Sequence, residues 1–158
     1  MIGTPRRPRY IGVMIDRLIK SLFAAEPQEL AEEDSRLALT ALLVRLARSD
    51  HDYDDAEINQ IESIIAARYH LGQAEATALR HEAEALEAEA PDTVRFTQAI
   101  KQAVPYEDRR RVVENAWAVV LADGVRADEE VALMRMVASF LGVSDRDSNI
   151  ARLQAAKS

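Results

Sequence analysis

The sequence predicts an all-α protein, a single-domain helical bundle of about seven to eight helices built from two pseudo-symmetric helix-loop-helix halves. Apolar residues recur at helical spacing, no stretch of useful length alternates as a strand does, and one acidic pattern occurs twice. The 158 residues suit one well-filled domain better than two independent cores. We divide the chain into an N-terminal amphipathic helix or extension, residues 1–25, and a helical domain, residues 26–158.

Composition narrows the class of protein. Hydrophobic residues make up 48% of the chain, with only 5 Gly and 5 Pro, which is typical of a helical globular protein. The formal net charge of −7 argues against a general nucleic-acid binder, because phosphate contacts need a Lys and Arg surface. The chain has no Cys, which excludes disulfides, thiolate catalysis and Cys-ligated zinc. We expect a cytoplasmic protein that binds no nucleic acid.

The stretch from residue 10 to residue 23 has the pattern of an amphipathic helix. Its apolar positions share one face: Ile11, Ile15, Leu18, Ile19 and Leu22. Charged residues at positions 16, 17 and 20 interrupt it, so it fits neither a secretory signal nor a membrane span. Two alternatives remain open. The helix docks on the domain or on a second subunit, or it lies on the inner membrane surface, where the preceding arginines contact anionic lipid.

The duplicated pattern centres on two acidic segments, SDHDYDDAE at residues 49–57 and ADGVRADEE at residues 122–130. Each segment follows an apolar helical stretch, places an Asp seven residues before a Glu, and leads into a second helical stretch. These features predict repeat halves at about residues 35–72 and 108–142.

The apolar faces of the helices are repeated as well. On the helix entering each acidic segment, adding 73 to the first set of residue numbers gives the second: Leu39, Leu43, Leu46 and Ala47, then Val112, Ala116, Val119 and Val120. The helices leaving the segments correspond in the same way: Ile58, Ile61, Ile64 and Ile65, then Val131, Met134, Val137 and Ala138. We expect these faces to be buried. Arg36, Arg45 and Arg48 are expected to face solvent.

Helix ends are marked by particular residues. Each repeat half stops at a Leu-Gly pair, and Gly72 and Gly142 are expected to adopt the left-handed conformation that terminates a helix. Further helices are expected at residues 73–90 and 93–103, separated by a Pro-Asp break. Another begins after Pro105, where the missing N–H is harmless, and the last runs from the capping residue Ser144 toward residue 154.

The paired acids are the candidate site residues. If the two halves pack about a pseudo-twofold axis, Asp50, Glu57, Asp123 and Glu130 converge as a carboxylate cluster. Asp52 and Asp54 are additional candidate ligands. Oxygen-only clusters suit hard cations such as Ca²⁺ or Mg²⁺. The alternative is that these acids only cap helices and favour the helix dipole.

A standard EF-hand does not fit the first acidic segment. Asp50, Asp52 and Asp54 occupy its first, third and fifth places. The sixth place is Asp55 where a sharp turn needs Gly, and the twelfth is Ile61 where a bidentate Glu is required.

The remaining distinctive side chains do not point to a catalytic or metal site. His51, His70 and His81 lie in separate segments without a common ligand spacing, which argues against zinc catalysis. Trp117 lies beside the repeated apolar face, so we expect it in the core or in an interface. The run of arginines at residues 109–111 is expected to form a solvated helical surface.

The segment LADGVRADEE at residues 121–130 resembles the TerB family, and the resemblance spans roughly residues 35–154. The first copy departs from the family pattern, with His51 where the pattern prefers Gly. The resemblance implies a compact helical bundle of two pseudo-symmetric halves, with acidic residues gathered on one surface. It also implies a place in bacterial tellurite-resistance and related stress-response systems.

These observations lead to a functional expectation. We expect a non-enzymatic stress-response module whose acidic face binds a divalent cation, Ca²⁺ or Mg²⁺, or a protein partner, with self-association included. No catalytic residue is assigned. The alternatives are a hydrolase-like enzyme that uses convergent carboxylates, and a membrane-peripheral adaptor that contacts the membrane surface through residues 10–23.

Overall fold

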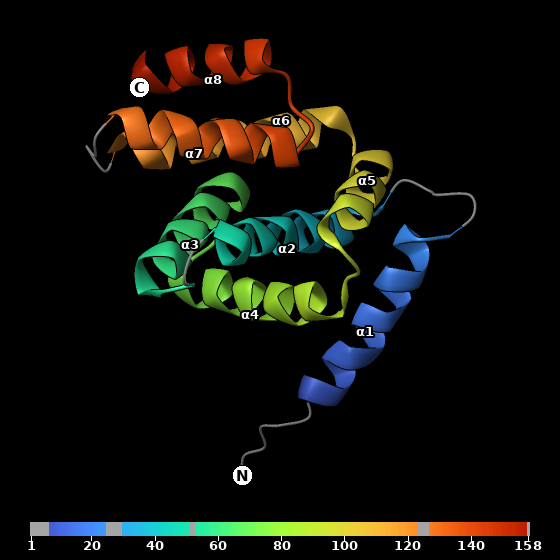
Figure 1. Ribbon diagram of the computed structural model, residues 1–158. Helices are drawn as coiled ribbons and strands as arrows, with labels where there is room; N and C mark the ends of the chain where they lie inside the picture. The colour runs from blue at the N-terminus through green and yellow to red at the C-terminus, as the bar shows by residue number, and fades with distance from the viewer. Residues whose placement is uncertain (1–6, 25–29, 51–52, 123–126, 158) are drawn as a thin grey trace.

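The structure is a computed structural model that describes residues 7–24, 30–50, 53–122 and 127–157. Its description of side chains excludes residues 7–14, 49–50 and 127–131. The described chain forms helices and no strand, as the sequence predicts (Figure 1). The helices are α1 (Arg7–Leu22), α2 (Glu32–Asp50), α3 (Asp55–Tyr69), α4 (Gln73–Glu89), α5 (Thr93–Ala103), α6 (Tyr106–Ala122), α7 (Ala127–Phe140) and α8 (Asp145–Lys157).

The two halves of the bundle each contain three helices. Helix α2 packs on α4 as α6 packs on α8, and the contact between α3 and α6 is matched by a contact between α2 and α7. Exchanging α2, α3 and α4 for α6, α7 and α8 therefore reproduces the packing, as a pseudo-twofold axis requires. Figure 1 shows α6, α7 and α8 stacked on the first half, with α5 joining them. The duplication thus extends one helix further than the sequence pattern indicates.

The repeated apolar faces form the core between these halves. Residues buried at the predicted positions are Leu39, Leu43, Leu46, Ile61, Ile64, Ile65, Val112, Ala116, Val120, Met134, Val137 and Ala138. Ala47 and Val119 are partly buried against them. Val131 lies outside the described side chains.

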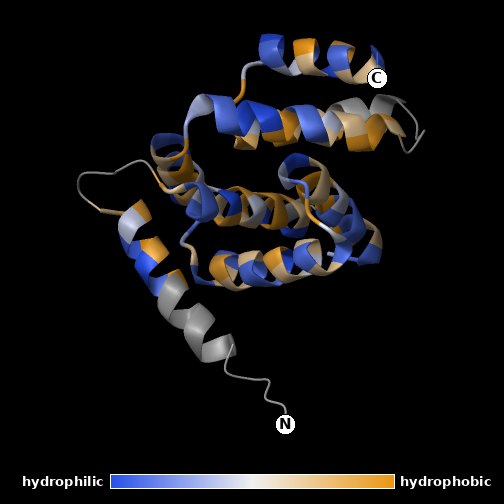
Figure 2. Ribbon diagram, turned by 180° about the vertical axis from the view of Figure 1, so that it is seen from behind, coloured by the Kyte–Doolittle hydropathy of each residue, from blue (hydrophilic) through white to orange (hydrophobic). Residues whose placement is uncertain are grey.

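Helix α2 is buried on more than the one face that the periodicity predicts. Every residue from 37 to 44 is buried, including Thr40, whose hydroxyl donates to the Arg36 carbonyl oxygen. The reason is packing, because α3, α4, α5 and α7 all contact α2. Apolar residues accordingly run along the middle of this helix (Figure 2).

A left-handed glycine was predicted at the end of each repeat half. The prediction is confirmed in the second half and wrong in the first. Gly142 has φ +69 and closes α7. Gly72 has φ −77 and precedes α4, while the left-handed position after α3 belongs to His70, with φ 57. The Leu71 N–H then bonds the Ala66 carbonyl oxygen at 3.0 Å, so the hydrogen-bond pattern of a glycine end forms around a histidine.

Arg45 does not face solvent as predicted. Its Nε donates to Glu87 Oε2 at 2.6 Å, and its Nη1 donates to the Pro91 carbonyl oxygen at 2.9 Å and to the Thr93 hydroxyl at 3.2 Å. Its Nη2 donates to the carbonyl oxygens of Glu87 and Ala90 at 3.0 and 3.4 Å. One guanidinium therefore joins α2 to the end of α4 and the start of α5.

Arg109 is likewise buried, although the sequence predicts solvent exposure for the whole arginine run. Its guanidinium donates to four main-chain carbonyl oxygens: Val104 at 3.1 Å, Leu141 at 2.8 Å, Gly142 at 3.2 Å and Lys101 at 3.4 Å. Burial lowers the pKa of Arg109 below its usual range. The negative ends of α5 and α7 supply the electrostatic partner, since no carboxylate among the described side chains pairs with Arg109. The neighbouring Arg111 is exposed, as predicted.

Helix α1 packs on α4 and α5. Ile15, Leu18 and Leu22 are buried there, so the described part of its apolar stripe is covered within the chain. Among the described residues, no helix has the length and apolar character needed to cross a membrane.

Substituting Ala for each of the two glycines separates their roles. Gly142→Ala is expected to cost at least about 2 kcal/mol, because it strains a left-handed residue and places a Cβ 2.7 Å from Arg109 Nη1. Gly72→Ala is the control, with ordinary φ and its nearest atom at 3.9 Å, and should change stability by less than about 1 kcal/mol. Urea unfolding measures both, and equal effects would contradict the assigned helix ends.

Neighbouring arginines on α6 allow a second matched comparison. Arg109→Met removes the donor shared by four buried carbonyl groups, so we expect a loss of about 3 kcal/mol or more in the free energy of unfolding. Arg110→Gln breaks only surface ion pairs with Glu107 and Glu114 and should cost at most about 1 kcal/mol. Chemical denaturation distinguishes the two, and a similar cost for both would disprove the structural role of Arg109.

Candidate functional site

The start of α3 is set by Asp54, one of the candidate ligands. Asp54 has extended backbone geometry, and its Oδ1 accepts the N–H of Glu57 at 3.1 Å. This is the N-cap arrangement, which satisfies a main-chain donor that no helical carbonyl reaches. Asp55 and Glu57 add negative charge to the first turn, where the helix dipole favours it. The capping interpretation is therefore confirmed for Asp54.

Tyr53 ties this acidic segment to α4. Its hydroxyl donates to Glu84 Oε2 at 2.7 Å, and Arg48 lies 5.0 Å from the centre of its ring. Burial raises the pKa of Tyr53 above its usual range, and the adjacent Glu84 carboxylate raises it further. Glu84 is itself bound by Arg80 at 2.6 Å. Tyr53 thus has a defined position on the first half.

The structure locates only part of the predicted carboxylate cluster. Asp54 is exposed, and Glu57 is half-buried on α3. Asp52 and Asp123 lie outside the described residues, as do the side chains of Asp50, at the end of α2, and Glu130, in α7. Within the described side chains, no group of three or more His, Asp or Glu is placed to hold a metal ion. Convergence of Asp50, Glu57, Asp123 and Glu130 therefore stays a prediction, as does the participation of Asp52 and Asp54.

The helix boundary also bears on the EF-hand comparison. Helix α3 begins at Asp55, which is the sixth place of the pattern that starts at Asp50. Residues in the second half of a 12-residue calcium loop are therefore already helical here. A standard EF-hand is absent from this segment, as its sequence predicts.

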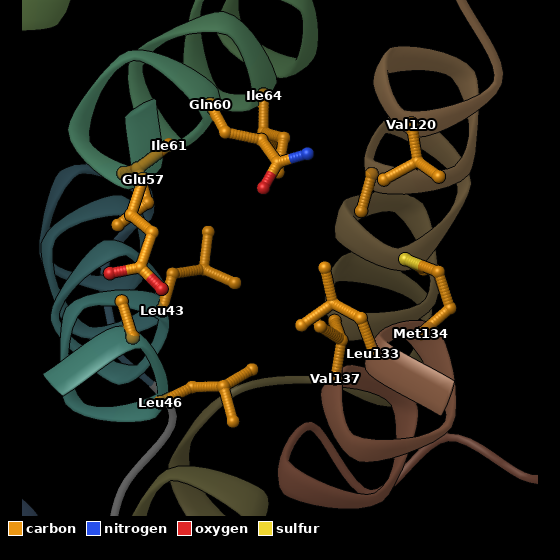
Figure 3. Close-up of a pocket in the computed structure, with 12 residues that line it drawn as sticks. Leu43, Leu46, Glu57, Gln60, Ile61, Ile64, Val120, Leu133, Met134 and Val137 are labelled. Atoms are coloured by element: carbon orange, nitrogen blue, oxygen red, sulfur yellow. The ribbon is translucent and has the colours of Figure 1, made fainter. Parts of the chain in front are cut away.

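A pocket of about 70 Å³ lies between the two halves, where the pseudo-twofold relation brings their equivalent residues together (Figure 3). Five residues of its first-half wall have their partners 73 positions later in the opposite wall: Leu43 and Ala116, Ala47 and Val120, Gln60 and Leu133, Ile61 and Met134, Ile64 and Val137. Leu46 and Glu57 complete the lining. The walls are almost wholly aliphatic, so the pocket suits a small apolar group and not an ion.

The polar atoms of this pocket come from one half. Figure 3 shows the Glu57 carboxylate and the Gln60 amide on the α3 side, while Leu133 occupies the position equivalent to Gln60. Glu57 was predicted as a site residue from the sequence, whereas Gln60 was not. The signal in the sequence is that Gln60 is polar while its equivalent in the second half, Leu133, is apolar.

The remaining candidates do not converge. His70 ends α3 and is exposed, His81 lies exposed on α4, and His51 lies outside the described residues. Trp117 is buried, and its indole N–H donates to the Ser148 hydroxyl at 3.0 Å, which confirms a core role.

Comparison with known proteins gives one match. The family model described as "Tellurite resistance protein TerB" matches residues 36–153. No curated protein and no solved structure matches the chain. The matched region runs from α2 into α8 and includes both acidic segments.

Two substitutions of Asp54 test its capping role. Asp54→Ala should lower the free energy of unfolding by about 1 kcal/mol, because the Glu57 N–H loses its acceptor. Asp54→Asn keeps an acceptor of the same length and should change stability by only a few tenths of a kcal/mol. Thermal or urea unfolding measures both. If Asp54→Ala is as stable as the unsubstituted protein, the cap does not contribute.

Proposed function

The chain belongs to the TerB family of tellurite resistance proteins, and from this premise we propose that it is a non-enzymatic stress-response module that binds a divalent cation through its six acids. These six are the predicted site residues: Asp50, Asp52, Asp54, Glu57, Asp123 and Glu130. The family match supports a module of the tellurite-resistance type. The cation and the ligand set are our proposal.

The observation that carries the proposal is the placement of α3 and α7. Both helices begin on the same side of the molecule, at the left in Figure 1, and each begins within an acidic segment. The contacts between helices follow a pseudo-twofold relation that makes Glu57 and Glu130 equivalent positions. Glu57 lies on the wall of the pocket between the halves, close to the region where equivalent residues approach one another.

The chemistry of the six acids favours a hard cation. Carboxylate oxygens are the ligands that Ca²⁺ and Mg²⁺ prefer. Several carboxylates held near one another repel, and a divalent cation relieves this repulsion. The same charge would repel tellurium oxyanions unless a bound cation bridged them. The first half carries four of the six acids, so we expect it to contribute most ligands.

Binding is favoured over hydrolysis by the surroundings of Glu57. A carboxylate that acts as a general acid or base needs an adjacent space that holds a substrate, commonly about 300 Å³ or more. The pocket beside Glu57 measures about 70 Å³ and has aliphatic walls.

Calorimetric titration of Ca²⁺, Mg²⁺ and Mn²⁺ tests the proposal. The unsubstituted protein should release or absorb heat on binding and gain about 2.7 kcal/mol of stability at a hundredfold excess over the dissociation constant. Combining Asp50→Asn with Asp123→Asn should abolish both effects, because it removes one ligand from each half.

Asp92→Asn is the matched control. Asp92 caps α5, and its Oδ2 accepts the Arg95 N–H at 3.2 Å, so the substitution replaces a carboxylate by an amide outside the predicted site. This variant should bind cations like the unsubstituted protein. If millimolar cation gives neither heat nor stabilisation, the cation function is wrong, and a protein partner becomes the function to test for the same acids.

A further inference from the structure

A polar cavity of about 350 Å³ lies away from the first acidic segment, at the other ends of the two helices that this segment joins, α2 and α3. It is formed where α2 begins, α3 ends and α6 begins. The residues lining it are Leu30, Glu32, Ser35, Arg36, Leu39, Arg68, Tyr69, Asp108 and Arg111. None of these belongs to the six-acid set. Three arginines and two acids give the lining a formal charge of +1.

Three buried polar atoms at this cavity have no hydrogen-bond partner among the described residues. They are the hydroxyl oxygen of Tyr69 and the Nε atoms of Arg36 and Arg68. Tyr69 is only 8% exposed. Burial raises its pKa to about 12, so the hydroxyl stays a hydrogen-bond donor at neutral pH. A buried donor without an acceptor costs free energy, which an entering ligand recovers.

The arginines of the cavity are loosely paired. Arg36 lies 3.6 Å from Glu32, whose side chain is 78% exposed, and Arg68 lies 4.0 Å from Asp108. By contrast, Arg45 lies 2.6 Å from Glu87. The cavity arginines therefore keep donor capacity that long ion pairs do not use.

The position of Arg36 is set by the Tyr69 ring. The guanidinium carbons of Arg36 and Arg68 lie 4.8 and 4.9 Å from the ring centre. Such stacking holds a guanidinium in place while its N–H groups remain directed around the ring edge. Two guanidinium groups are thus held against the same aromatic ring, and all three residues line the cavity.

The second half provides an internal comparison. Arg36 and Arg109 are equivalent positions, 73 residues apart. In the second half, the Arg109 guanidinium donates to carbonyl oxygens that include those of Leu141 and Gly142. Among the described residues Arg36 forms no bond to a carbonyl oxygen of this kind, and the cavity lies beside it.

We propose that this cavity binds a phosphate group through Arg36, Arg68, Arg111 and the Tyr69 hydroxyl. Guanidinium groups bind phosphate with paired N–H donors, and three of them line this cavity around a further buried donor. The volume exceeds that of a phosphate ion, so a small organic phosphate fits as well. This site goes beyond the proposed cation function and shares no residue with it.

Thermal unfolding with added phosphate tests the proposal at constant ionic strength, with NaCl as the reference salt. A hundredfold excess over the dissociation constant should raise the melting temperature by about 5–10 °C. Inorganic phosphate and adenosine monophosphate are the two probes. Similar dissociation constants identify free phosphate as the ligand class, while tighter binding of the nucleotide identifies an organic phosphate, and both outcomes support the site.

Four variants locate the binding. Arg68→Gln and Arg111→Gln should each weaken phosphate binding at least about tenfold, by loss of charged donors. Tyr69→Phe should weaken it too, while its melting temperature without phosphate stays the same or rises, because the lost hydroxyl has no partner. Arg146→Gln, an exposed arginine on α8, changes net charge equally and should bind normally.

Two results would overturn the proposal. One is the absence of any phosphate-dependent shift up to about 50 mM in the unsubstituted protein, a concentration well above an ordinary metabolite affinity. The other is an equal shift in all four variants, which would place the anion elsewhere on the surface.

Discussion

The carbonyl groups at buried C-terminal helix ends need hydrogen-bond donors, and in this bundle two arginines supply them. The last carbonyl groups of any helix have no partner within that helix, and each one left unpaired in the interior costs about 1–3 kcal/mol. Arg45 binds the end of α4, and Arg109 binds the ends of α5 and α7. Each guanidinium belongs to the central helix of its half, α2 or α6. The connections between helices are therefore held to the core, which fixes how the halves meet.

The two halves resemble each other in the interior between them and differ at the ends of their helices. Equivalent aliphatic residues face one another across the pocket between the halves. Away from that interface the copies differ. Arg109 is enclosed by carbonyl groups, whereas its equivalent Arg36 borders a polar cavity. The first acidic segment is also the more acidic of the two. Burial constrains the shared interior to one packing arrangement, while residues at the ends of helices are free to diverge and acquire ligands.

Capping and ligand binding are compatible roles for the acids. Asp54 uses one oxygen to accept the Glu57 N–H, and a carboxylate has several lone pairs. A cap also places the carboxylate at a defined point before the helix, which reduces the cost of organising a binding site. Family membership and the location of α3 and α7 support this use of the acidic segments. The cavity at the start of α2 and the end of α3 has a net positive lining, the opposite charge to that of the acidic segments.

Apolar periodicity and capping residues act over a few neighbouring positions, so the helices, the duplication and most helix caps could be predicted from the sequence. Ser144 and Asp54 cap as their spacing predicts, and Gly142 ends α7. The folded chain was needed to show that Arg45 and Arg109 are enclosed by other helices, that α2 is covered on most sides, and that α8 is the counterpart of α4. These features depend on which helices pack together. Spacing along one helix indicates which residues share a face. Which other helices cover that face depends on how the whole chain packs. For the candidate site, the same limit applies: spacing identified Asp54 and Glu57, while the pocket and the arginine cavity exist only where separate helices meet.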